Sequence, residues 1–503
     1  MSIPLLSALI FLPVLGGLSL LAVPRQQTAT IRLMALIVSV LEFGLCLPVA
    51  LLFDKTTPLL QFREHHPWIS TLNINYSLGI DGISILFLLL TTLIIVLSIL
   101  VSWDSIGEKV QEFYVAMLLL EGAMMGVFCA VDLFLFYIFW EAMLIPMFLI
   151  IGIWGGPNRI YATVKFFLYT LVGSLLMLVG LLLLYHHGGQ TFDLLKLAGQ
   201  DYPLGLQRIL FWSFFAAFAV KVPMWPVHTW LPDAHTEAPA AGSVILAGVL
   251  IKMGAYGFLR FSLPIVPQAT VEMMPVMLVL SVIAIVYGAI ICLAQTDLKR
   301  LVAYSSVSHM GFITLGLFAL NQRGLEGGIL QMVNHGVVTG ALFLAIGMIY
   351  ERTHTREIAA YGGLASTMPI FAGFFLLFTL AAVGLPGTNG FVGEFLILLG
   401  GFERQPWVAV VSASGLILGA WYMLWLYQRI FFNEVKPAML GLAGINTREI
   451  LTLLPMAALI FWIGLYPNAL LSFLHVSVQH LIEQVNGTAL PPTMLGLHQI
   501  LQP

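Results

Sequence analysis

Long apolar segments set the strongest limit on what this chain can fold into. Stretches of about 20 mostly apolar residues recur along it, and 60% of its 503 residues are hydrophobic while only 9% are charged. About 20 such residues cross the hydrocarbon core of a bilayer as an α-helix, whereas barrel strands are shorter and alternate in polarity. We therefore expect an all-α polytopic membrane protein that forms a single membrane domain over residues 1–503.

Hydropathy and helix-breaking residues predict about fourteen transmembrane helices. Their approximate ranges are 3–23, 31–53, 80–101, 112–130, 133–154, 161–186, 206–233, 240–262, 273–293, 300–320, 326–350, 366–402, 407–431 and 449–470. The first has no basic start and no clear cleavage site, so we expect a span there and not a signal peptide. Lys and Arg are more frequent in the loops on one side, and this asymmetry places both termini on the external side.

Two of the predicted spans contain a break. The seventh holds the sequence VKVPMWP, and the twelfth holds VGLPGTNG at residues 383–390. Proline cannot donate the backbone hydrogen bond that a helix needs, so it breaks or kinks the helix. If residues 112–262 (helices 4–8) and 273–431 (helices 9–13) are repeats, each has five spans and the two copies must be inverted, as in transporters. The alternative is two unrelated proline kinks.

Lys221 lies directly before the first break, after a long apolar run. A lysine ammonium near the middle of a membrane costs roughly 2.5–3.5 kcal/mol on insertion scales. Pro223, Pro226 and Pro232 follow it, so helix 7 is expected to open beside the charge and expose backbone dipoles to it. Such an expensive residue calls for a functional explanation.

Six ionisable residues are predicted to lie near the middle of the membrane. They are Glu141, Lys221, Lys252, His309, His335 and Glu394. Counting from the turns between antiparallel helices places Lys221 level with Lys252, and His309 level with His335. Ionisable groups inside membranes typically mark ion or proton pathways, and histidine titrates near neutral pH. The sequence therefore predicts a proton relay through these six residues.

Several other polar residues are ambiguous. His228, His235 and Glu237 are of metal-ligand type, but they flank prolines and have no third ligand at a usual spacing, so His228 is better placed in the relay or at its exit. Glu121 is expected to be buried without an assigned role. Lys165 lies near a helix end, where it can extend its ammonium toward water.

The cysteines and the overall charge exclude other kinds of site. Cys46, Cys129 and Cys292 are isolated within apolar runs, so neither a metal-binding motif nor a disulfide framework is indicated. The formal net charge of −3 offers no basic patch for nucleic acid.

Residues 218–243, FAVKVPMWPVHTWLPDAHTEAPAAGS, together with 244–261, VILAGVLIKMGAYGFLRF, closely resemble the antiporter-like membrane subunits of respiratory complex I. The resemblance extends over most of the chain. It implies that Glu141 pairs with Lys221, that Lys252 connects them laterally, and that the two histidines lead toward Glu394. The sister L-type and N-type subunits carry lysine on helix 12, so Glu394 indicates the M type, also called chain 4. The residues after 470 are too few for the long lateral helix of the L type, which agrees with that assignment.

The resemblance further implies a function. The chain would be a proton-translocating module of a bacterial NADH:quinone oxidoreductase in the inner membrane, with both termini periplasmic and with L-type and N-type neighbours. It would itself hold no cofactor, because FMN, iron–sulfur clusters, NADH and quinone would react elsewhere in the complex. No G-x-G-x-x-G nucleotide-binding motif follows a predicted strand.

Four alternatives remain open from the sequence alone. The chain could belong to a multi-subunit cation/proton antiporter or to a membrane-bound hydrogenase-type complex. It could also carry haem between His309 and His335. An inert scaffold is the last alternative, but it leaves six buried ionisable residues unexplained.

Overall fold

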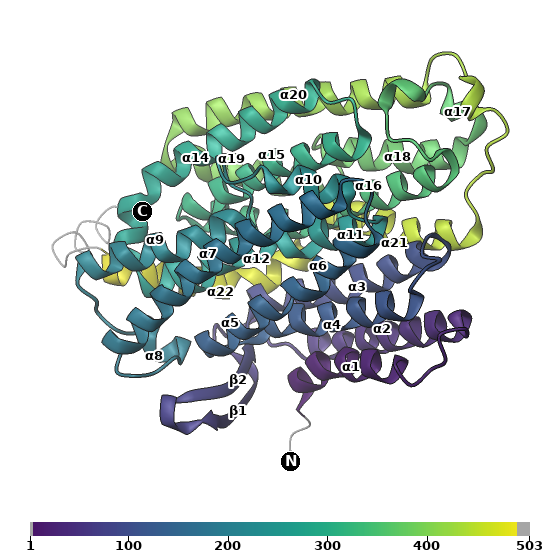
Figure 1. Cartoon of the computed structure of the whole chain (residues 1–503). Coiled ribbons are helices and arrows are strands. Elements are labelled where there is room, and N and C mark those ends of the chain that lie inside the picture. The colour runs from purple at the N-terminus through teal and green to yellow at the C-terminus, as the bar shows by residue number, and fades with distance from the viewer. Residues whose placement is uncertain (1–3, 490–503) are drawn as a thin grey trace.

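The computed structural model describes residues 4–489 and consists almost entirely of helices. Most long helices lie side by side, and their connections gather at two ends of the molecule (Figure 1). We call one the hairpin end, because it carries the two strands β1 (Gln61–Ile69) and β2 (Ile74–Ile80) and the short helix α8 (Leu194–Ala198). The other is the α17 end, named after the short helix α17 (Leu364–Thr367).

The first half of the chain forms the helices that contain Glu141, Lys221 and Lys252. These are α1 (Leu5–Leu20), α2 (Thr28–Leu51), α3 (Gly82–Ser105), α4 (Val110–Cys129), α5 (Leu133–Ala142), α6 (Leu144–Trp154), α7 (Arg159–His187), α9 (Leu204–Lys221), α10 (Trp230–Glu237), α11 (Ala240–Ile245), η2 (Leu246–Leu250), α12 (Ile251–Gly257), η3 (Phe258–Ser262) and α13 (Leu263–Ile265). The elements η2 and η3 are π-helical.

The second half of the chain also consists mainly of long helices. It contains α14 (Pro267–Leu293), α15 (Leu298–Phe318), α16 (Gln322–Thr353), α18 (Pro369–Ala382), α19 (Asn389–Arg404), α20 (Pro406–Phe431), α21 (Thr447–Leu465) and α22 (Asn468–Ala489). Short 3-10 turns lie at Ser70–Leu72, Ile358–Ala360 and Pro437–Met439.

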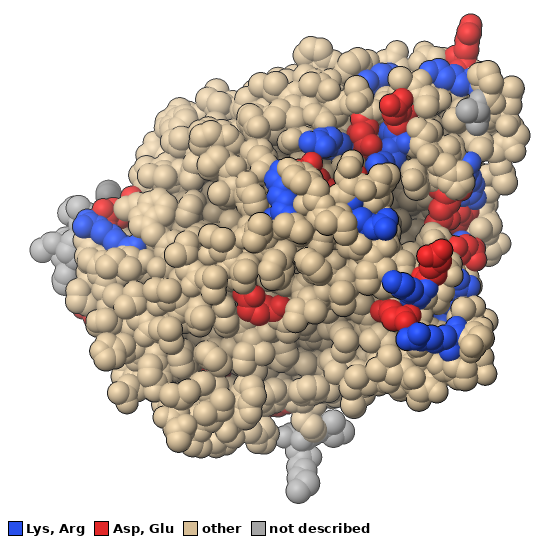
Figure 2. Space-filling model, in the orientation of Figure 1, with Lys and Arg blue, Asp and Glu red and all other residues tan. Residues whose placement is uncertain are grey.

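The expected all-α membrane architecture is confirmed. Within the described residues, twelve helical segments are long and apolar enough to cross a membrane, and Leu5–Leu20 and Pro369–Ala382 are shorter apolar helices. Charged side chains on the visible face gather mainly toward the α17 end and leave a broad uncharged band (Figure 2). The count of fourteen spans and the two inverted repeats, 112–262 and 273–431, stay predictions.

Polar caps fix where several spans begin. The Asp81 carboxylate accepts hydrogen bonds from the N–H groups of Ile83 and Ser84 at the start of α3, each at 3.0 Å. Asp132, Asp297 and Asn321 cap α5, α15 and α16 in the same way. Because the first N–H groups of a helix have no partner inside it, these short polar side chains stabilise the helix starts at the ends of the bundle.

Both predicted helix breaks are present. Helix α9 ends at Lys221, and α10 resumes at Trp230 after the proline-rich segment. The N–H of Met224 donates to the Ala219 carbonyl, and the Trp230 indole donates to the Val220 carbonyl at 2.9 Å. In the second break, α18 ends at Ala382 and α19 begins at Asn389. The first break therefore keeps its backbone carbonyls bonded inside the membrane, as the absence of water there requires.

Several elements differ from the predicted spans. The predicted span 133–154 is interrupted at Met143, because Pro146 has no N–H to give to the carbonyl of Ala142. Residues predicted only as a loop form the antiparallel β1–β2 hairpin. Helix α22, after the last predicted span, packs against α3, α14 and α16. Its Ser477 hydroxyl accepts from the Gly82 N–H at 3.1 Å, so α22 lies against the hairpin-end start of α3.

Candidate functional site: a buried chain of ionisable side chains

Four of the six predicted relay residues form one continuous set of contacts, which we call the central chain. It consists of Lys252, His335, His309 and Glu394. The Lys252 Nζ lies 2.6 Å from the His335 Nδ1, and the rings of His335 and His309 have centroids 5.6 Å apart. The His309 Nδ1 lies 3.2 Å from the Glu394 Oε1. All four residues are buried, and they come from four different helices: α12, α16, α15 and α19.

The π-helical segment η2 lies directly before Lys252. Its backbone hydrogen bonds span five residues where those of an α-helix span four, so the Ile251 N–H bonds to the Leu246 carbonyl. The Lys252 ammonium turns back and donates to the Ala247 carbonyl as well as facing His335. A backbone oxygen and an imidazole thus replace part of the hydration that a buried lysine loses. Such π-segments are found frequently at functional sites.

The break between α18 and α19 is close to the Glu394 carboxylate. A Cβ added at Gly384, which has φ +72°, would lie 2.7 Å from the Glu394 Oε2. The Gln331 Nε2 lies 3.2 Å from the Glu394 Oε1, the same oxygen that faces His309. The second break therefore leaves room for an acid that two side chains from neighbouring helices contact.

Glu141 and Lys221 form a second group at the first break. The Lys221 Nζ lies 5.1 Å from the centre of the Trp140 ring, a cation–π contact, and Glu141 is the next residue along α5. The two charges interact electrostatically, but in the part of the chain that the structure describes no direct ion pair joins them. Neither the Lys221 Nζ nor the Glu141 Oε1 has a hydrogen-bond partner within the described chain. A buried ammonium held only by a ring face and a nearby carboxylate is weakly compensated.

The central chain and the Glu141–Lys221 group are connected by packing between α12 and the end of α9, and not, in the described chain, by contacts between their ionisable side chains. Gly254, two residues after Lys252, packs against the backbone of Phe218 and Val222 on either side of Lys221. Within residues 4–489, no hydrogen bond joins Lys221 to Lys252 directly. His228 is buried beside the rings of Tyr287 and Tyr304, with centroids 5.2 Å and 6.5 Å away, and among the described residues its ring nitrogens form no hydrogen bond to either group.

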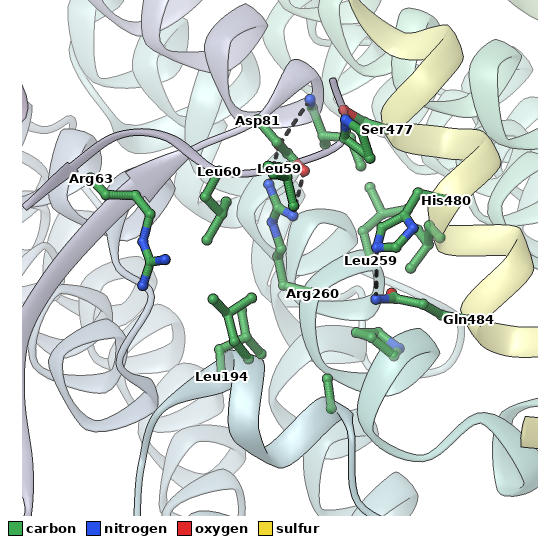
Figure 3. A pocket seen from close by; sticks show the side chains of 16 residues that line it. Leu59, Leu60, Arg63, Asp81, Leu194, Leu259, Arg260, Ser477, His480 and Gln484 are labelled. Carbon is green, nitrogen blue, oxygen red and sulfur yellow. Dashed lines mark hydrogen bonds and ion pairs between the residues drawn. The ribbon is translucent and has the colours of Figure 1, made fainter. Parts of the chain in front are cut away.

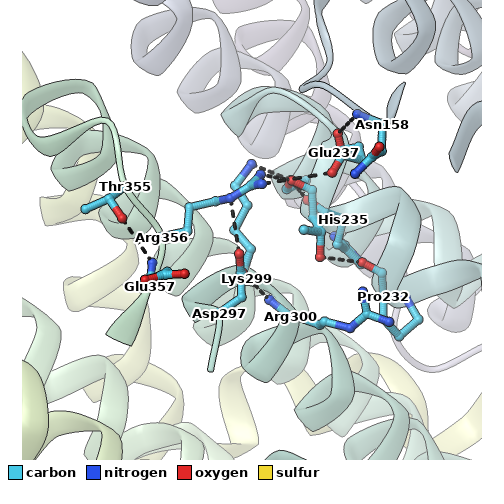
Figure 4. Close-up of polar contacts among 12 residues, drawn as sticks. Asn158, Pro232, His235, Glu237, Asp297, Lys299, Arg300, Thr355, Arg356 and Glu357 are labelled. Carbon is cyan, nitrogen blue, oxygen red and sulfur yellow. Dashed lines mark hydrogen bonds and ion pairs between the residues drawn. The ribbon is translucent and has the colours of Figure 1, made fainter. Parts of the chain in front are cut away.

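A cavity of about 530 Å³ opens at the α17 end and contains Lys299, Glu237 and Arg356 in its lining. Lys299 is 4% exposed, and its Nζ donates to the Ala238 carbonyl at 2.6 Å and lies 3.4 Å from the Ser243 Oγ. Arg356 reaches across from the loop after α16 toward Glu237 and Asp297 (Figure 4). This group, which we call the α17-end cluster, combines a buried lysine with access from the cavity.

His235 lies between that cluster and the central chain. Its ring stacks on Phe343 with centroids 4.6 Å apart, and both ring nitrogens lack a hydrogen-bond partner among the described residues. It is within electrostatic range of both Lys299 and Lys252. The sequence indicates His235 only as a residue of metal-ligand type. The spacing between Lys221 and the DAHTEAP turn could have indicated where His235 lies. Its proximity to Lys299 could not be predicted, because Lys299 comes from a distant helix that the sequence does not pair with His235.

Two buried acids lie outside these groups. Glu121 is fully buried, as expected, and it lies beside Glu42 of α2, which is also fully buried. Lys165, which lies near the start of α7, donates to the Asp233 carboxylate at 2.7 Å, and its side chain stays partly exposed. Among residues 4–489, no group of three His, Cys, Asp or Glu side chains is arranged to hold a metal ion.

The fold and these residues can now be compared with known proteins. A family model described as "NADH:quinone oxidoreductase/Mrp antiporter, TM" matches residues 130–419, more than half of the chain. The chain belongs to this family. All six predicted relay residues and both helix breaks fall within the matched range.

Curated relatives cover nearly the whole length of this family member. NADH-quinone oxidoreductase subunit M of Rhodobacter capsulatus is 50% identical over 501 residues, covering 96% of this chain and 97% of the relative. NADH-ubiquinone oxidoreductase chain 4 of Arabidopsis thaliana is 49% identical, with coverage of 95% and 97%.

Solved structures share the fold. A chain of respiratory complex I from Thermus thermophilus superposes with a TM-score of 0.88 at 34% identity, covering 95% of this chain and 99% of that one. A chain of an Mrp complex from Dietzia sp. gives a TM-score of 0.83 at 22% identity, with coverage of 98% and 100%. The second likeness is evidence for the fold alone.

Proposed function

We propose that this chain is the M-type antiporter-like subunit of a NADH:quinone oxidoreductase and translocates protons across the membrane. The observation that carries the proposal is the central chain, which links four helices through buried ionisable contacts. The near-complete coverage of relatives named subunit M and chain 4 supports the assignment to this complex. Redox chemistry takes place in other subunits, with FMN, iron–sulfur clusters, NADH and quinone.

The central chain can pass a proton in single steps. The Lys252 ammonium donates toward the His335 Nδ1, and a histidine that accepts a proton on one ring nitrogen can release one from the other. His309 then lies between His335 and the Glu394 carboxylate. Each step moves a proton between groups whose charged forms are costly in an apolar interior, so small changes in their partners decide where the proton resides.

The Glu141–Lys221 group supplies the charge that biases the central chain. A carboxylate close to Lys221 favours the ammonium form, and a longer separation favours the neutral amine. Because Gly254 holds α12 against the end of α9, a shift at the first break changes the surroundings of both lysines together. This coupling connects Glu141 to the proton carried by Lys252.

Protons enter from the α17 end. The cavity there reaches Lys299, whose ammonium contacts Ser243, and the Ser243 Oγ in turn donates to the His235 carbonyl. Neither ring nitrogen of His235 has a hydrogen-bond partner within residues 4–489, and the ring lies toward Lys252. In this proposal the α17 end faces the bacterial cytoplasm, both termini are periplasmic, and L-type and N-type subunits adjoin the chain in the membrane.

The decisive experiment measures proton uptake into vesicles that carry the assembled complex with Lys221→Ala, together with NADH oxidation and subunit content. Normal assembly with loss of both proton uptake and coupled electron transfer supports the proposal. Lys299→Met tests the entry route, and it is expected to slow uptake while the complex stays assembled. Normal rates in the Lys221→Ala complex would show that this lysine is structural.

A further inference from the structure

A second cavity lies at the hairpin end, away from the relay. Its volume is about 220 Å³, and it is bordered by the hairpin strand β1, the short helix α8 and the last helix α22 (Figure 3). Its polar lining includes Arg63, Asp81, Arg260 and His480. It is a separate feature, because none of the six relay residues lines it.

The floor of this cavity is electrically neutral. The Arg260 Nη1 lies 2.7 Å from the Asp81 Oδ2, and its Nη2 lies 2.8 Å from the Ser84 Oγ. A guanidinium forms strong paired contacts with a carboxylate, so this ion pair leaves neither partner available for a ligand. Any charge that the cavity offers to a ligand must come from elsewhere in its lining.

Arg63 provides that charge. It extends from β1 toward the cavity in Figure 3, and within residues 4–489 it forms neither an ion pair nor a hydrogen bond. His480 of α22 lies on the other side of the floor. The lining therefore carries one uncompensated guanidinium, which suits a phosphate or carboxylate group.

The remaining wall is apolar and continues to the outside. Leu59, Leu60, Leu194 and Leu259 line the cavity, and Leu59 is 70% exposed. Asp81 caps the first residue of a span, so the cavity lies at the depth where spans end and lipid headgroups begin. The cavity volume is large enough for a phosphate and a glycerol group but not for the two acyl chains of a lipid. Such acyl chains would have to extend past the exposed leucines into the bilayer.

We propose that this cavity binds the headgroup of an anionic glycerophospholipid, with its phosphate on Arg63 and its glycerol against the leucines. A free phosphate would find the same guanidinium but would not use the apolar wall. The combination of one unpaired cation and an exposed apolar rim at span-end depth therefore selects an amphipathic anion. The site is independent of the proton relay.

The test is photo-crosslinking of the assembled complex in vesicles of phosphatidylcholine that contain a diazirine-bearing phosphatidylglycerol. Crosslinked peptides are mapped by mass spectrometry. We expect labelling of residues 58–63 and 477–484, reduced roughly five-fold in Arg63→Gln, which is the effect of about 1 kcal/mol from one basic residue at a membrane surface. Arg63→Lys should retain most labelling, and Lys196→Gln on nearby α8, which does not line the cavity, should retain all of it.

Further arms distinguish the sources of the anion. Leu59→Asp should also lower the labelling, because it places a negative charge on the apolar rim. A diazirine phosphatidylcholine, whose choline neutralises the charge of its phosphate, should lose less labelling in Arg63→Gln than phosphatidylglycerol does. Equal phosphatidylglycerol labelling in wild type and Arg63→Gln would overturn the proposal. Full displacement by inorganic phosphate would overturn the choice of a lipid.

Discussion

The Nζ of Lys252 lies 2.6 Å from the Nδ1 of His335, across the interface between α12 and α16. The same ammonium donates to the Ala247 carbonyl in the π-helical segment of its own helix. One buried lysine is therefore bound between a fixed backbone acceptor and a titratable side chain. This arrangement makes Lys252 the residue through which the central chain can be tested most directly.

Replacing Lys252 with glutamine should stop proton transfer to His335 because an amide cannot take up and release a proton. We expect NADH-driven proton uptake to fall about 100-fold or more, the contribution of a positioned proton-transfer group. The measurement is uptake by vesicles containing the assembled complex. Lys196→Gln removes one exposed lysine outside the relay and should leave the rate unchanged; a similar loss in both variants would contradict a specific role for Lys252.

Glu394→Gln tests whether the other end of the central chain needs a carboxylate or only a side chain of this size. The amide keeps the size of the side chain and its contact with Gln331, but it cannot accept a proton from His309. Proton uptake should fall strongly with normal subunit content, whereas Glu394→Asp should retain part of the activity. If the glutamine variant pumps normally, protons do not pass through Glu394.

Gly254→Ala should damage the contact between α9 and α12. A Cβ there would lie 2.7 Å from the Phe218 carbonyl oxygen and 2.8 Å from the Val222 nitrogen, and backbone atoms cannot move aside as a flexible side chain can. We expect a loss of stability of about 1–3 kcal/mol, seen as lower thermal stability of the complex. Gly373→Ala is the matched control, because nothing lies within 4 Å of the added atom.

Tyr361 provides a pH-dependent test in the loop at the α17 end. Burial raises the pKa of its phenol to about 12, and its hydroxyl lies 2.8 Å from the Thr353 Oγ1 and donates to the Thr355 carbonyl at 2.6 Å. A raised pKa favours the neutral phenol in the fold, so its stabilisation is complete below about pH 10, the ordinary tyrosine value, and is lost as the pH rises toward 12.

Tyr361→Phe should remove this stabilisation at every pH, at a cost of about 1–2 kcal/mol. Limited proteolysis of the complex at residues 355–363 between pH 7 and pH 11 measures it. Wild type should be more resistant than the variant at neutral pH, and the difference should shrink at the alkaline end. A constant difference across this range would contradict the role of the phenol.

The helical membrane fold and both helix breaks could be predicted from the sequence, because apolar length and proline act locally. From the residues themselves, the members of the central chain could be predicted only to lie at a common depth, and the direction from the histidines toward Glu394 came from the family resemblance. Their order, with His309 beside Glu394 and His335 beside Lys252, depends on which helices are neighbours, and that is set by packing over long sequence separations.

Other features carry weak or distant signals. The β1–β2 hairpin contains Pro67 and lacks regular alternation, so its strand pattern is poor. The π-helical segments have no proline or glycine pattern that separates them from an ordinary helix. In the sequence Lys299 is a lysine close to a loop, and only the structure shows that its ammonium donates to the Ala238 carbonyl. Glu121 could be recognised as buried, but its neighbour Glu42 lies on a helix that the sequence does not connect to it.

The position of the central chain along its helices determines where the membrane voltage acts. Lys252, His309 and His335 each lie near the middle of their helices, Ala240–Ile265, Leu298–Phe318 and Gln322–Thr353. In the proposed relay, a proton that moves from one to the next stays at nearly one depth and crosses almost none of the electric field, which amounts to about 2.3 kcal/mol per charge for each 100 mV of full crossing. The electrical work of pumping in this proposal falls on the two short routes that join this level to the surfaces, and the long lateral transfer between helices proceeds at nearly constant potential.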